Sequence, residues 1–238
     1  YNYIMKSTIL DKTKLVNSVF SKVYKKYDLM NDIMSLGIHR IWKKKFIDWM
    51  NPFSDSKLID VASGTGDIAK LFSKKNNNSS EIMCVEPNKE MLEEGEKNLR
   101  EFRNIKWIKS HAEKLPFKDN TYDYYSISYG IRNVTNINKT LKEAYRVLKP
   151  GGRFMCLEFS KIDNESLNFF YKQYSKVIPL IGKYVIGSSE PYEYLVESID
   201  RFYTQDQLIE LMDNNGFSNT EYRNLSNGVS AIHSGWKI

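Results

Sequence analysis

The stretch LIDVASGTGD, residues 58–67, constrains the fold more than any other part of the chain. An apolar, strand-like run leads into a glycine-rich turn, and an amphipathic helical pattern follows at once. Gly64 and Gly66 can adopt positive φ and let a ligand approach the backbone, while Asp60 and Asp67 place two carboxylates beside them. The pattern predicts a buried strand that turns sharply into a helix at a nucleoside-binding site.

Two cofactor classes fit this turn, and a purely structural glycine turn is a third interpretation. The GxGxxA spacing of residues 64–69, with Glu86 at 20 residues beyond the second glycine, satisfies the loose dinucleotide fingerprint. A pyrophosphate would then lie beside Asp67, where two like charges about 4 Å apart at a dielectric near 20 repel by roughly 4 kcal/mol. S-adenosylmethionine instead carries an ammonium and a sulfonium, which Asp60 and Asp67 attract. The charges favour S-adenosylmethionine over NAD, with Glu86 accepting ribose hydroxyls.

Composition places the chain among ordinary globular proteins. Its 238 residues, 41% hydrophobic and 27% charged, can bury a sizeable core, and one domain with a small appendage is the simplest organisation. The net charge of +6 favours an anionic neighbour, either nucleic acid or phospholipid, but a soluble enzyme with a lysine-rich surface has the same balance. The chain has no basic stripe interleaved with aromatic residues, so we expect no nucleic-acid partner.

Cysteine and histidine usage argues against disulfides and metal centres. Cys84 and Cys156 each lie in an apolar, strand-like run, which predicts buried thiols in a reducing compartment. The three histidines have no metal-ligand spacing, so we expect no structural metal. No run reaches the ~18 to 20 apolar residues of a membrane span, because lysines and Pro179 interrupt the nearest candidate, residues 169–187.

Strand and helix patterns alternate along most of the chain. Two helical stretches, residues 16–27 and 33–49, precede the first strand. Strand-like runs follow at residues 57–62, 81–86, 105–110, 122–128 and 153–159, and then at 217–223 and 229–236. The alternation predicts an α/β fold with a mostly parallel sheet that ends in an antiparallel pair. This is the architecture of class I methyltransferases, a Rossmann-like seven-stranded sheet with the last strand antiparallel.

Three further segments mark helix ends and insertions. Residues 164–187 and 190–202 are helical and interrupt the alternation after the fifth strand, where insertions usually cover a ligand crevice. The sequence Lys-Pro-Gly-Gly at residues 149–152 is predicted to end a helix. Thr204 and Gln207 form the pattern of a capping box at the start of another helix.

Motifs outside the glycine turn identify a family. They are YDLMNDIMSLGIHRIWK at residues 27–43, GIRNVT at 130–135 and SEPYEYL at 189–195. Together they resemble the ubiquinone/menaquinone biosynthesis C-methyltransferases, and the similarity runs from about Val19 to the HSGWK ending at residues 233–237. The resemblance is far more specific than a glycine loop alone, because these motifs lie throughout the chain.

The resemblance implies methyl transfer from S-adenosylmethionine to a ring carbon of a polyprenylated benzoquinol, 2-methoxy-6-polyprenyl-1,4-benzoquinol, in ubiquinone biosynthesis. A demethylmenaquinone naphthoquinol is the alternative substrate, and a small-molecule O- or N-methyltransferase is the alternative enzyme. The family's cofactor contacts fall on Thr65, Glu86, His111, Ala112 and Ser128. Three positions depart from the family's common pattern: serine replaces a frequent glycine at 63, glutamate replaces a frequent aspartate at 86, and histidine replaces aspartate or asparagine at 111.

A phenol carbon is a poor nucleophile until the neighbouring hydroxyl ionises, which costs roughly 4 kcal/mol at pH 7 for a pKa near 10. Arg132 follows the fourth strand and is the candidate for stabilising the phenolate, and Asn133 is the candidate for orienting the ring oxygen. A guanidinium stays protonated and is not a base. The candidate proton acceptors are, in order, a water polarised by Arg132, Tyr27 and His39.

Each of these residues also has a structural interpretation. Arg132 could pair with Glu158 or Glu190, and Tyr27 and His39 could be packed in the core. The run at residues 43–45, three lysines, could be a solvated face or a phospholipid-facing patch. The aromatic residues between 169 and 174 could be core beneath a lid or the lining of a prenyl channel. A nucleic-acid-binding module and an inactive scaffold in a quinone-making complex are the competing functional classes.

We therefore expect residues 1–52 to form an N-terminal helical cap over the active site. Residues 53–238 are expected to form the methyltransferase domain, with a helical lid insertion at 164–203. The expected partners are the polyprenylated quinol, a membrane surface contacted peripherally, a second copy in a homodimer and other quinone-biosynthesis enzymes. The expected location is the matrix side of the mitochondrial inner membrane in a eukaryote, after removal of a targeting segment, or the cytoplasm in a bacterium.

Overall fold

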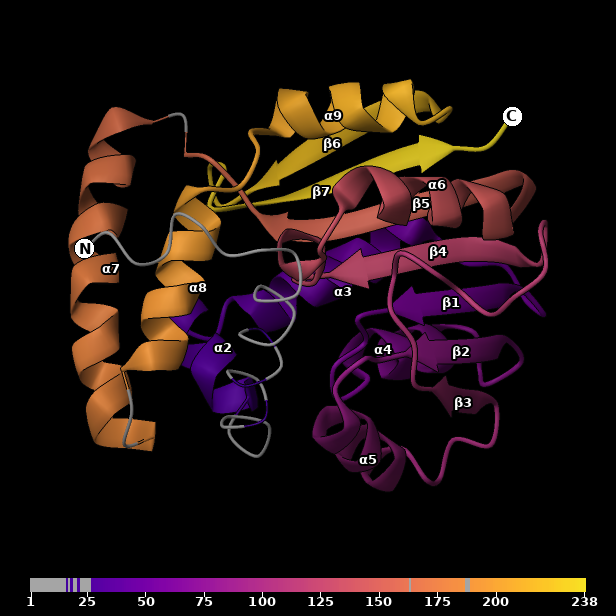
Figure 1. The fold of residues 1–238 in the computed structure, drawn as a ribbon, viewed down its shortest axis with the longest axis horizontal. Helices are drawn as coiled ribbons and strands as arrows, with labels where there is room; N and C mark the ends of the chain where they lie inside the picture. Colours follow the sequence, from indigo (N-terminus) through magenta and orange to yellow (C-terminus); the bar gives the residue numbers. More distant parts are fainter. Residues whose placement is uncertain (1–15, 17, 19–20, 22–26, 163, 187–188) are drawn as a thin grey trace.

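The computed structural model describes residues 16, 18, 21, 27–162, 164–186 and 189–238 (Figure 1). Its strands are β1 (Lys57–Val61), β2 (Glu81–Val85), β3 (Ile105–Ile108), β4 (Tyr122–Ser128), β5 (Leu148–Phe159), β6 (Ser218–Leu225) and β7 (Ser230–Trp236). They form one sheet in the order β3-β2-β1-β4-β5-β7-β6. Strand β7 runs antiparallel to both of its neighbours, β5 and β6, and the other described strand pairs are parallel. The predicted α/β sheet and its antiparallel last strand are confirmed.

Helices connect the strands and cover the sheet. They are α2 (Tyr27–Ser35), α3 (His39–Met50), α4 (Asp67–Lys75), α5 (Lys89–Asn98), the 3₁₀ turn η2 (Ile131–Asn133), α6 (Ile137–Val147), α7 (Glu165–Ile186), α8 (Glu190–Asp200) and α9 (Gln205–Asn214). The predicted capping box opens α9, with the hydroxyl of Thr204 accepting from the backbone N–H of Gln207. Helices α4, α5 and α6 each link two consecutive parallel strands, as the crossover connections of a parallel sheet require.

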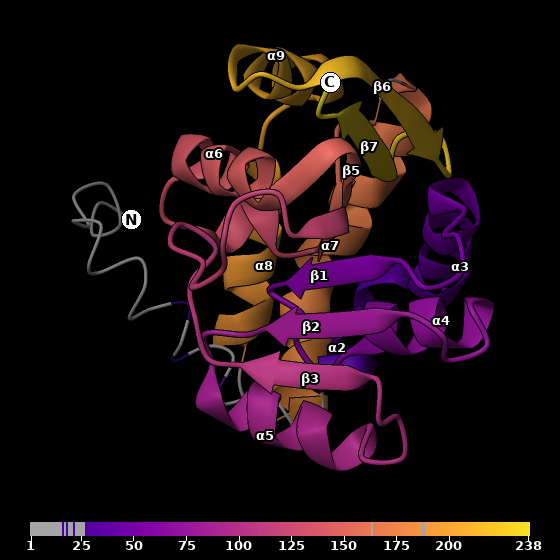
Figure 2. The ribbon, with the colours of Figure 1, turned by 90° about the vertical axis from the view of Figure 1, so that its right-hand side faces the viewer.

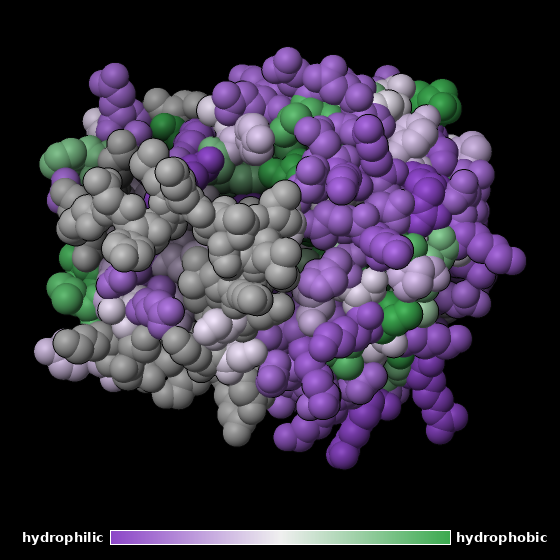
Figure 3. Space-filling view, in the orientation of Figure 1, coloured by the Kyte–Doolittle hydropathy of each residue, from purple (hydrophilic) through white to green (hydrophobic). Residues whose placement is uncertain are grey.

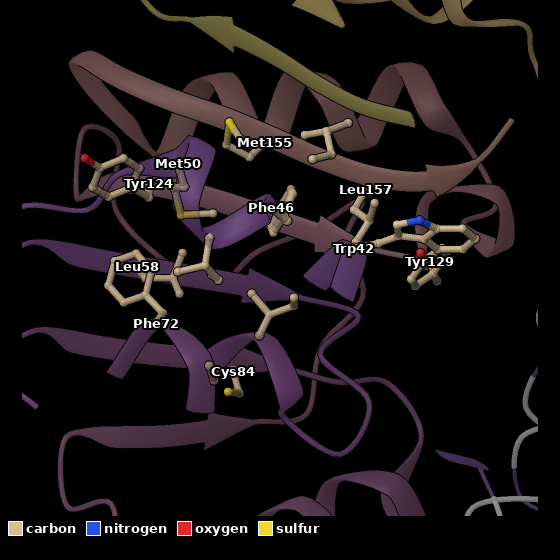
Figure 4. Packing of buried hydrophobic residues seen from close by; sticks show 14 of the residues in the cluster. Trp42, Phe46, Met50, Leu58, Phe72, Cys84, Tyr124, Tyr129, Met155 and Leu157 are labelled. Carbon is tan, nitrogen blue, oxygen red and sulfur yellow. The ribbon is translucent and has the colours of Figure 1, made fainter. Parts of the chain in front are cut away.

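The sheet is buried on both faces, as its apolar strands predict. Helices α3 and α4 pack on one face, where Trp42, Phe46 and Leu157 belong to a single apolar cluster (Figure 4). Helices α6 and α9 pack on the other face, as Figure 2 shows from the side. Alternate residues of β5 serve the two cores, since Leu157 belongs to the first cluster and Cys156 to the second.

The carboxyl ends of β1 and β4 point toward α2 and α8, with α7 beyond them (Figure 1). This places the turn that follows β1 at the crevice edge of an open α/β sheet, where such folds bind ligands. Helices α7 and α8 pack on each other, and α2 contacts α7. The two helical segments that precede β1 and follow β5 therefore meet beside the strand ends.

Several sequence predictions need correction. Residues 33–49 form two helices rather than one, because Leu36 and Gly37 adopt positive φ of 52° and 77° and break the helix between α2 and α3. Residues 149–152 do not simply end α6: they belong to the irregular start of β5, where the pairing register shifts against β4. The predicted first helix lies mostly outside the described residues. Pro179 is inside α7, which continues through it.

The prediction of buried thiols is also confirmed. Cys84 and Cys156 are buried free thiols. No cluster of three potential metal ligands occurs in the part of the chain that the structure describes. None of the described helices has the length and apolar character that a membrane crossing needs.

Candidate active site

Two crevices adjoin at the turn between β1 and α4. We call the first the Glu86 crevice, and its lining includes Ala62, Gly64, Glu86, Met91, His111, Ala112, Tyr129 and Asn133. We call the second the Asp60 crevice, and its lining residues are Lys43, Asp60, Ala62, Ser63, Gly64, Thr65, Asp67, Ile68, Ser128 and Tyr129. Ala62, Gly64 and Tyr129 line both crevices. A ligand that spans this shared wall would have one end in each crevice.

The predicted cofactor residues divide between these crevices, apart from Gly66. That glycine has a φ of +90° at the N-cap of α4, and a Cβ there would lie 2.6 Å from Cδ1 of Leu99. Packing of α4 against Leu99, as well as the turn, therefore requires glycine at this position. The predicted positive φ of Gly66 is confirmed, but the sequence interpretation did not include the packing against Leu99, because it could not place Leu99 next to the turn.

Glu86 is buried at the end of β2 and is tied to the glycine turn. Its Oε2 accepts the backbone N–H of Gly64 at 2.9 Å, and its Oε1 accepts that of Asn88 at 2.9 Å. Burial raises the pKa of Glu86 to about 7, although these two hydrogen bonds oppose the shift. Each carboxylate oxygen keeps acceptor capacity, because an ionised carboxylate has about four lone-pair positions.

Asp60 is the deepest charged group of its crevice, with only 1% of its surface exposed. Its Oδ1 accepts the hydroxyl of Ser126 at 2.6 Å, whereas its Oδ2 has no hydrogen-bond partner among the described residues. The hydroxyl of Ser128 is also buried without a partner there. Burial raises the pKa of Asp60 to about 7, opposed by Ser126 and by the nearby charge of Lys43. Buried polar atoms are rarely left unpaired, so the crevice fits a ligand that supplies donors.

Asp67 already has a cation beside it. The Nζ atom of Lys43 lies 2.6 Å from its Oδ2, and this neighbour lowers the pKa of Asp67 against the effect of burial. The prediction that residues 43–45 form a solvated face is wrong for Lys43, whose side chain is 8% exposed. Helix α3 turns this residue inward beside Trp42 and Phe46, while Lys44 and Lys45 stay exposed.

The two non-glycine residues shared by the crevices, Ala62 and Tyr129, have left-handed backbones. Their φ values are 52° and 55°, which side chains other than glycine rarely adopt. A Cβ at Gly130 would lie 2.6 Å from the Cβ of Ala62, so the ends of β1 and β4 meet closely. Strain of this kind gathers at functional sites. Sequence reasoning missed both residues, since neither type signals a positive φ.

Arg132 lies in η2, beside the crevices but outside their linings. Its Nη1 donates to Oε1 of Glu158 at 2.5 Å and to the backbone oxygen of Tyr129 at 2.8 Å. Both members of the Arg132–Glu158 ion pair are buried, with side chains 4% and 1% exposed. The structural interpretation of Arg132 is therefore confirmed for Glu158. Burial raises the pKa of Glu158, and the Arg132 charge opposes this shift.

The other predicted catalytic residues have different settings. Asn133 lines the Glu86 crevice, and its Oδ1 accepts the hydroxyl of Tyr194 at 2.9 Å. His39 is buried, lies 2.9 Å through Nε2 from Oδ1 of Asp32, and lines neither crevice. Its pKa is lowered by burial and by the Lys43 charge. The side chain of Tyr27 lies outside the described ones, so its role stays a prediction.

A family model described as the ubiE/COQ5 methyltransferase family matches residues 7–237. The chain belongs to this family. The ubiquinone/menaquinone biosynthesis C-methyltransferase UbiE of Rickettsia bellii is 53% identical over 235 residues, which cover 96% of this chain and 94% of that protein. The mitochondrial 2-methoxy-6-polyprenyl-1,4-benzoquinol methylase of Dictyostelium discoideum is 44% identical over 260 residues, which cover 96% of this chain and 83% of that protein.

Solved structures show the same fold as this ubiE/COQ5 family member. A SAM-dependent methyltransferase from Aquifex aeolicus aligns with a TM-score of 0.61 and 14% identity, covering 98% of this chain and 100% of that one. Phosphoethanolamine N-methyltransferase 2 of Haemonchus contortus, solved with S-adenosyl-L-methionine, aligns with a TM-score of 0.62 and 14% identity. The alignment covers 82% of this chain and 52% of that one. The class I fold is confirmed, and the family member is an S-adenosylmethionine-dependent methyltransferase.

The crevices of this ubiE/COQ5 methyltransferase fit that cofactor. The unpartnered Oδ2 of Asp60 is a buried acceptor, and an ammonium supplies donors and a positive charge. A pyrophosphate would instead place negative charges beside Asp60 and Glu86, and Lys43, the one lysine or arginine described in the two linings, is already paired with Asp67. The acidic linings therefore agree with the sequence preference for S-adenosylmethionine over NAD.

Proposed function

We propose that the protein methylates a ring carbon of a polyprenylated benzoquinol, 2-methoxy-6-polyprenyl-1,4-benzoquinol, with S-adenosylmethionine as the methyl donor. The observation that carries this proposal is near-full-length similarity, at 44% identity, to a Dictyostelium protein named for that reaction. The Rickettsia relative at 53% identity is named for both ubiquinone and menaquinone biosynthesis. A demethylmenaquinone naphthoquinol is therefore the second candidate substrate.

The cofactor is proposed to span both crevices. Glu86 accepts the ribose hydroxyls, and His111 and Ala112 border the adenine in the same crevice. The methionyl end lies in the Asp60 crevice, with its ammonium on Asp60 and with Gly64, Thr65, Asp67 and Ser128 around it. The support for this assignment is the division of these residues between two adjoining crevices and the unpartnered buried oxygens of Asp60 and Ser128.

The ring is proposed to lie at the mouth of the Glu86 crevice, next to η2. The hydroxyl proton of the quinol passes to a water polarised by Arg132, and the guanidinium stabilises the phenolate. S-adenosylmethionine would supply the methyl group to the ring carbon and leave as S-adenosylhomocysteine. The proton displaced from that carbon would pass to water, which restores the aromatic phenolate. Asn133, held by Tyr194, orients the ring oxygen. Glu158 offsets much of the Arg132 charge, so positioning supplies the rest of the rate.

Methyl analysis tests this proposal. Purified protein is incubated with labelled S-adenosylmethionine and short-tailed quinols of both ring types, and the added methyl is located by mass spectrometry. We expect the label on a ring carbon of the benzoquinol. Label on the naphthoquinol alone would show that the proposed substrate is wrong. Label on oxygen or nitrogen would show that the proposed C-methylation is wrong. An exposed-surface variant, Asp48→Asn, serves as a control of equal activity.

The tail of the substrate suggests a membrane contact through α7. Its exposed apolar residues recur at helical spacing: Phe169, Phe170, Val177, Leu180 and Tyr184. The expectation of an aromatic core here is wrong for Phe169 and Phe170, which are 59% and 69% exposed. Figure 3 shows hydrophobic surface at the left margin, where α7 lies. We propose that this helix touches the lipid surface and that α7 and α8, within residues 164–203, cover the ring as a lid.

Vesicle binding tests the membrane contact. The double variant Phe170→Ser/Leu180→Ser should bind anionic phospholipid vesicles at least about 100-fold more weakly than the wild type in a sedimentation assay. Each change removes an apolar side chain whose burial in lipid is worth about 1.5 to 3 kcal/mol, and about 1.4 kcal/mol is a factor of ten. Phe53→Ser is the matched control, since Phe53 is 56% exposed but precedes β1 at the opposite end of the strands. Equal sedimentation of the double variant and the wild type would contradict the proposal.

A further inference from the structure

Lys43 is the one lysine or arginine in the lining of the Asp60 crevice, counted over the described residues. It belongs to α3, which precedes β1, so a helix outside the glycine turn contributes to this crevice. Its side chain is 8% exposed, and its Nζ lies 2.6 Å from Oδ2 of Asp67. Burying an ammonium costs free energy that a single half-exposed partner offsets only in part. The ion pair with Asp67 therefore does not by itself explain why the Lys43 ammonium is buried at a ligand crevice.

The methionyl end of S-adenosylmethionine carries three charges. The sulfonium and the α-ammonium are positive, and the α-carboxylate is negative. The lining of the Asp60 crevice offers two carboxylates, Asp60 and Asp67, and one ammonium, Lys43. The carboxylates suit the two cations, but they would repel the cofactor's carboxylate, which loses water when it enters. Lys43 is the lining group that can compensate this charge.

We propose that Lys43 binds the α-carboxylate of the cofactor, while Asp67 holds the Lys43 ammonium in position. An ammonium has three donors, and Asp67 takes one of them at 2.6 Å. The inference rests on the proposed function, since it names a contact to the same cofactor. It also makes α3 part of the cofactor site: the Lys43–Asp67 ion pair joins α3 to the first turn of α4.

Binding calorimetry with two inhibitors tests this inference. S-adenosylhomocysteine and its decarboxylated analogue differ only in the α-carboxylate, and both keep the adenosine and the amine. The wild type should bind S-adenosylhomocysteine about 10- to 100-fold more tightly than the analogue, the range of a charge-assisted hydrogen bond. Lys43→Met should bind the two compounds with affinities equal to within about twofold, because the partner of the carboxylate is gone.

Three controls accompany this comparison. Lys44→Met changes the exposed neighbour in α3 and should keep the wild-type ratio. Lys43→Arg keeps a cation and should keep most of the ratio. Affinity for the decarboxylated analogue should be similar in the wild type and in Lys43→Met, which shows that the crevice is still folded. If Lys43→Met does not fold, Lys43→Gln is used in its place. The affinity ratio of the two inhibitors is then compared between Lys43→Gln and Lys43→Arg.

The outcomes separate this inference from the proposed function. A wild-type ratio retained by Lys43→Met overturns the role of Lys43 alone. Tighter binding of both compounds to Lys43→Met also overturns it, because Lys43 would then compete with the cofactor ammonium for Asp67. Absence of binding of either compound to the wild type overturns the proposed cofactor site and this inference together.

Discussion

Replacing Asp60 with asparagine is expected to weaken S-adenosylhomocysteine binding at least about 100-fold, the range found when one partner of a buried charge pair is removed. Asparagine keeps the size of the side chain and an oxygen for the hydroxyl of Ser126, which lies 2.6 Å from Oδ1 of Asp60. It lacks the negative charge that the cofactor ammonium is proposed to meet at Oδ2. The substitution creates no cavity, so the loss of affinity reports the charge.

The same substitution is expected to stabilise the cofactor-free protein at pH 8. Burial raises the pKa of Asp60 to about 7 in the folded chain, from its ordinary value of 3.8. Between pH 3.8 and pH 7 the folded chain therefore keeps a proton that the unfolded chain has released. Its contribution to stability is therefore present below about pH 4 and is lost as the pH rises to about 7. The cost above pH 7 is on the order of 4 kcal/mol, which asparagine avoids.

Urea unfolding and calorimetry measure the two effects. The stability difference between Asp60→Asn and the wild type should grow from pH 5 to pH 7 and then stay constant. Cofactor binding near pH 6 should release more protons from the wild type than from the variant, which keeps Glu86 but lacks the Asp60 carboxyl group. Asp48→Asn, which changes an exposed aspartate paired with Lys75, is the control. Unchanged affinity, or a variant less stable than the wild type at pH 8, would refute the assigned role of Asp60.

Replacing Arg132 with methionine is expected to abolish turnover and also to destabilise the fold by about 3 to 5 kcal/mol. The reason is Glu158, whose buried carboxylate lies 2.5 Å from Nη1 of Arg132. Removing one partner leaves a buried charge without compensation. A loss of activity in this single variant therefore mixes a catalytic effect with a structural one.

The double variant Arg132→Met/Glu158→Gln separates the two effects. Glutamine removes the unpaired charge and still accepts the backbone N–H of Phe159, which Oε1 of Glu158 accepts at 2.9 Å. We expect most of the stability to return while kcat stays lower by at least roughly 100-fold, the usual cost of losing one electrostatic stabiliser. Affinity for S-adenosylhomocysteine should be close to that of the wild type. Recovery of turnover together with stability would show that Arg132 is structural.

Local patterns predicted the secondary structure because their causes lie within a few residues. Alternating apolar residues predicted β4 at its observed bounds, and the Thr204–Gln207 capping box predicted the start of α9. The largest error, one helix over residues 33–49, arose because Gly37 was not taken as a helix end, although glycine commonly follows one; the positive φ of Leu36 is not signalled by its residue type. The glycine turn and its acidic residues likewise predicted the cofactor class, since charge type is readable from residue type.

Residue types and their spacing were enough to predict the class of fold, the glycine turn after β1 and the acidic groups that suit a cationic nucleoside. The pairing of charges, in contrast, is set by how the helices pack on the sheet. Lys43 meets Asp67, and Arg132 meets Glu158, across 24 and 26 residues of chain. Such pairs depend on how α3 docks on α4 and how η2 docks on β5. Residue spacing does not specify these distances, because they follow from the packing of the two cores around the sheet.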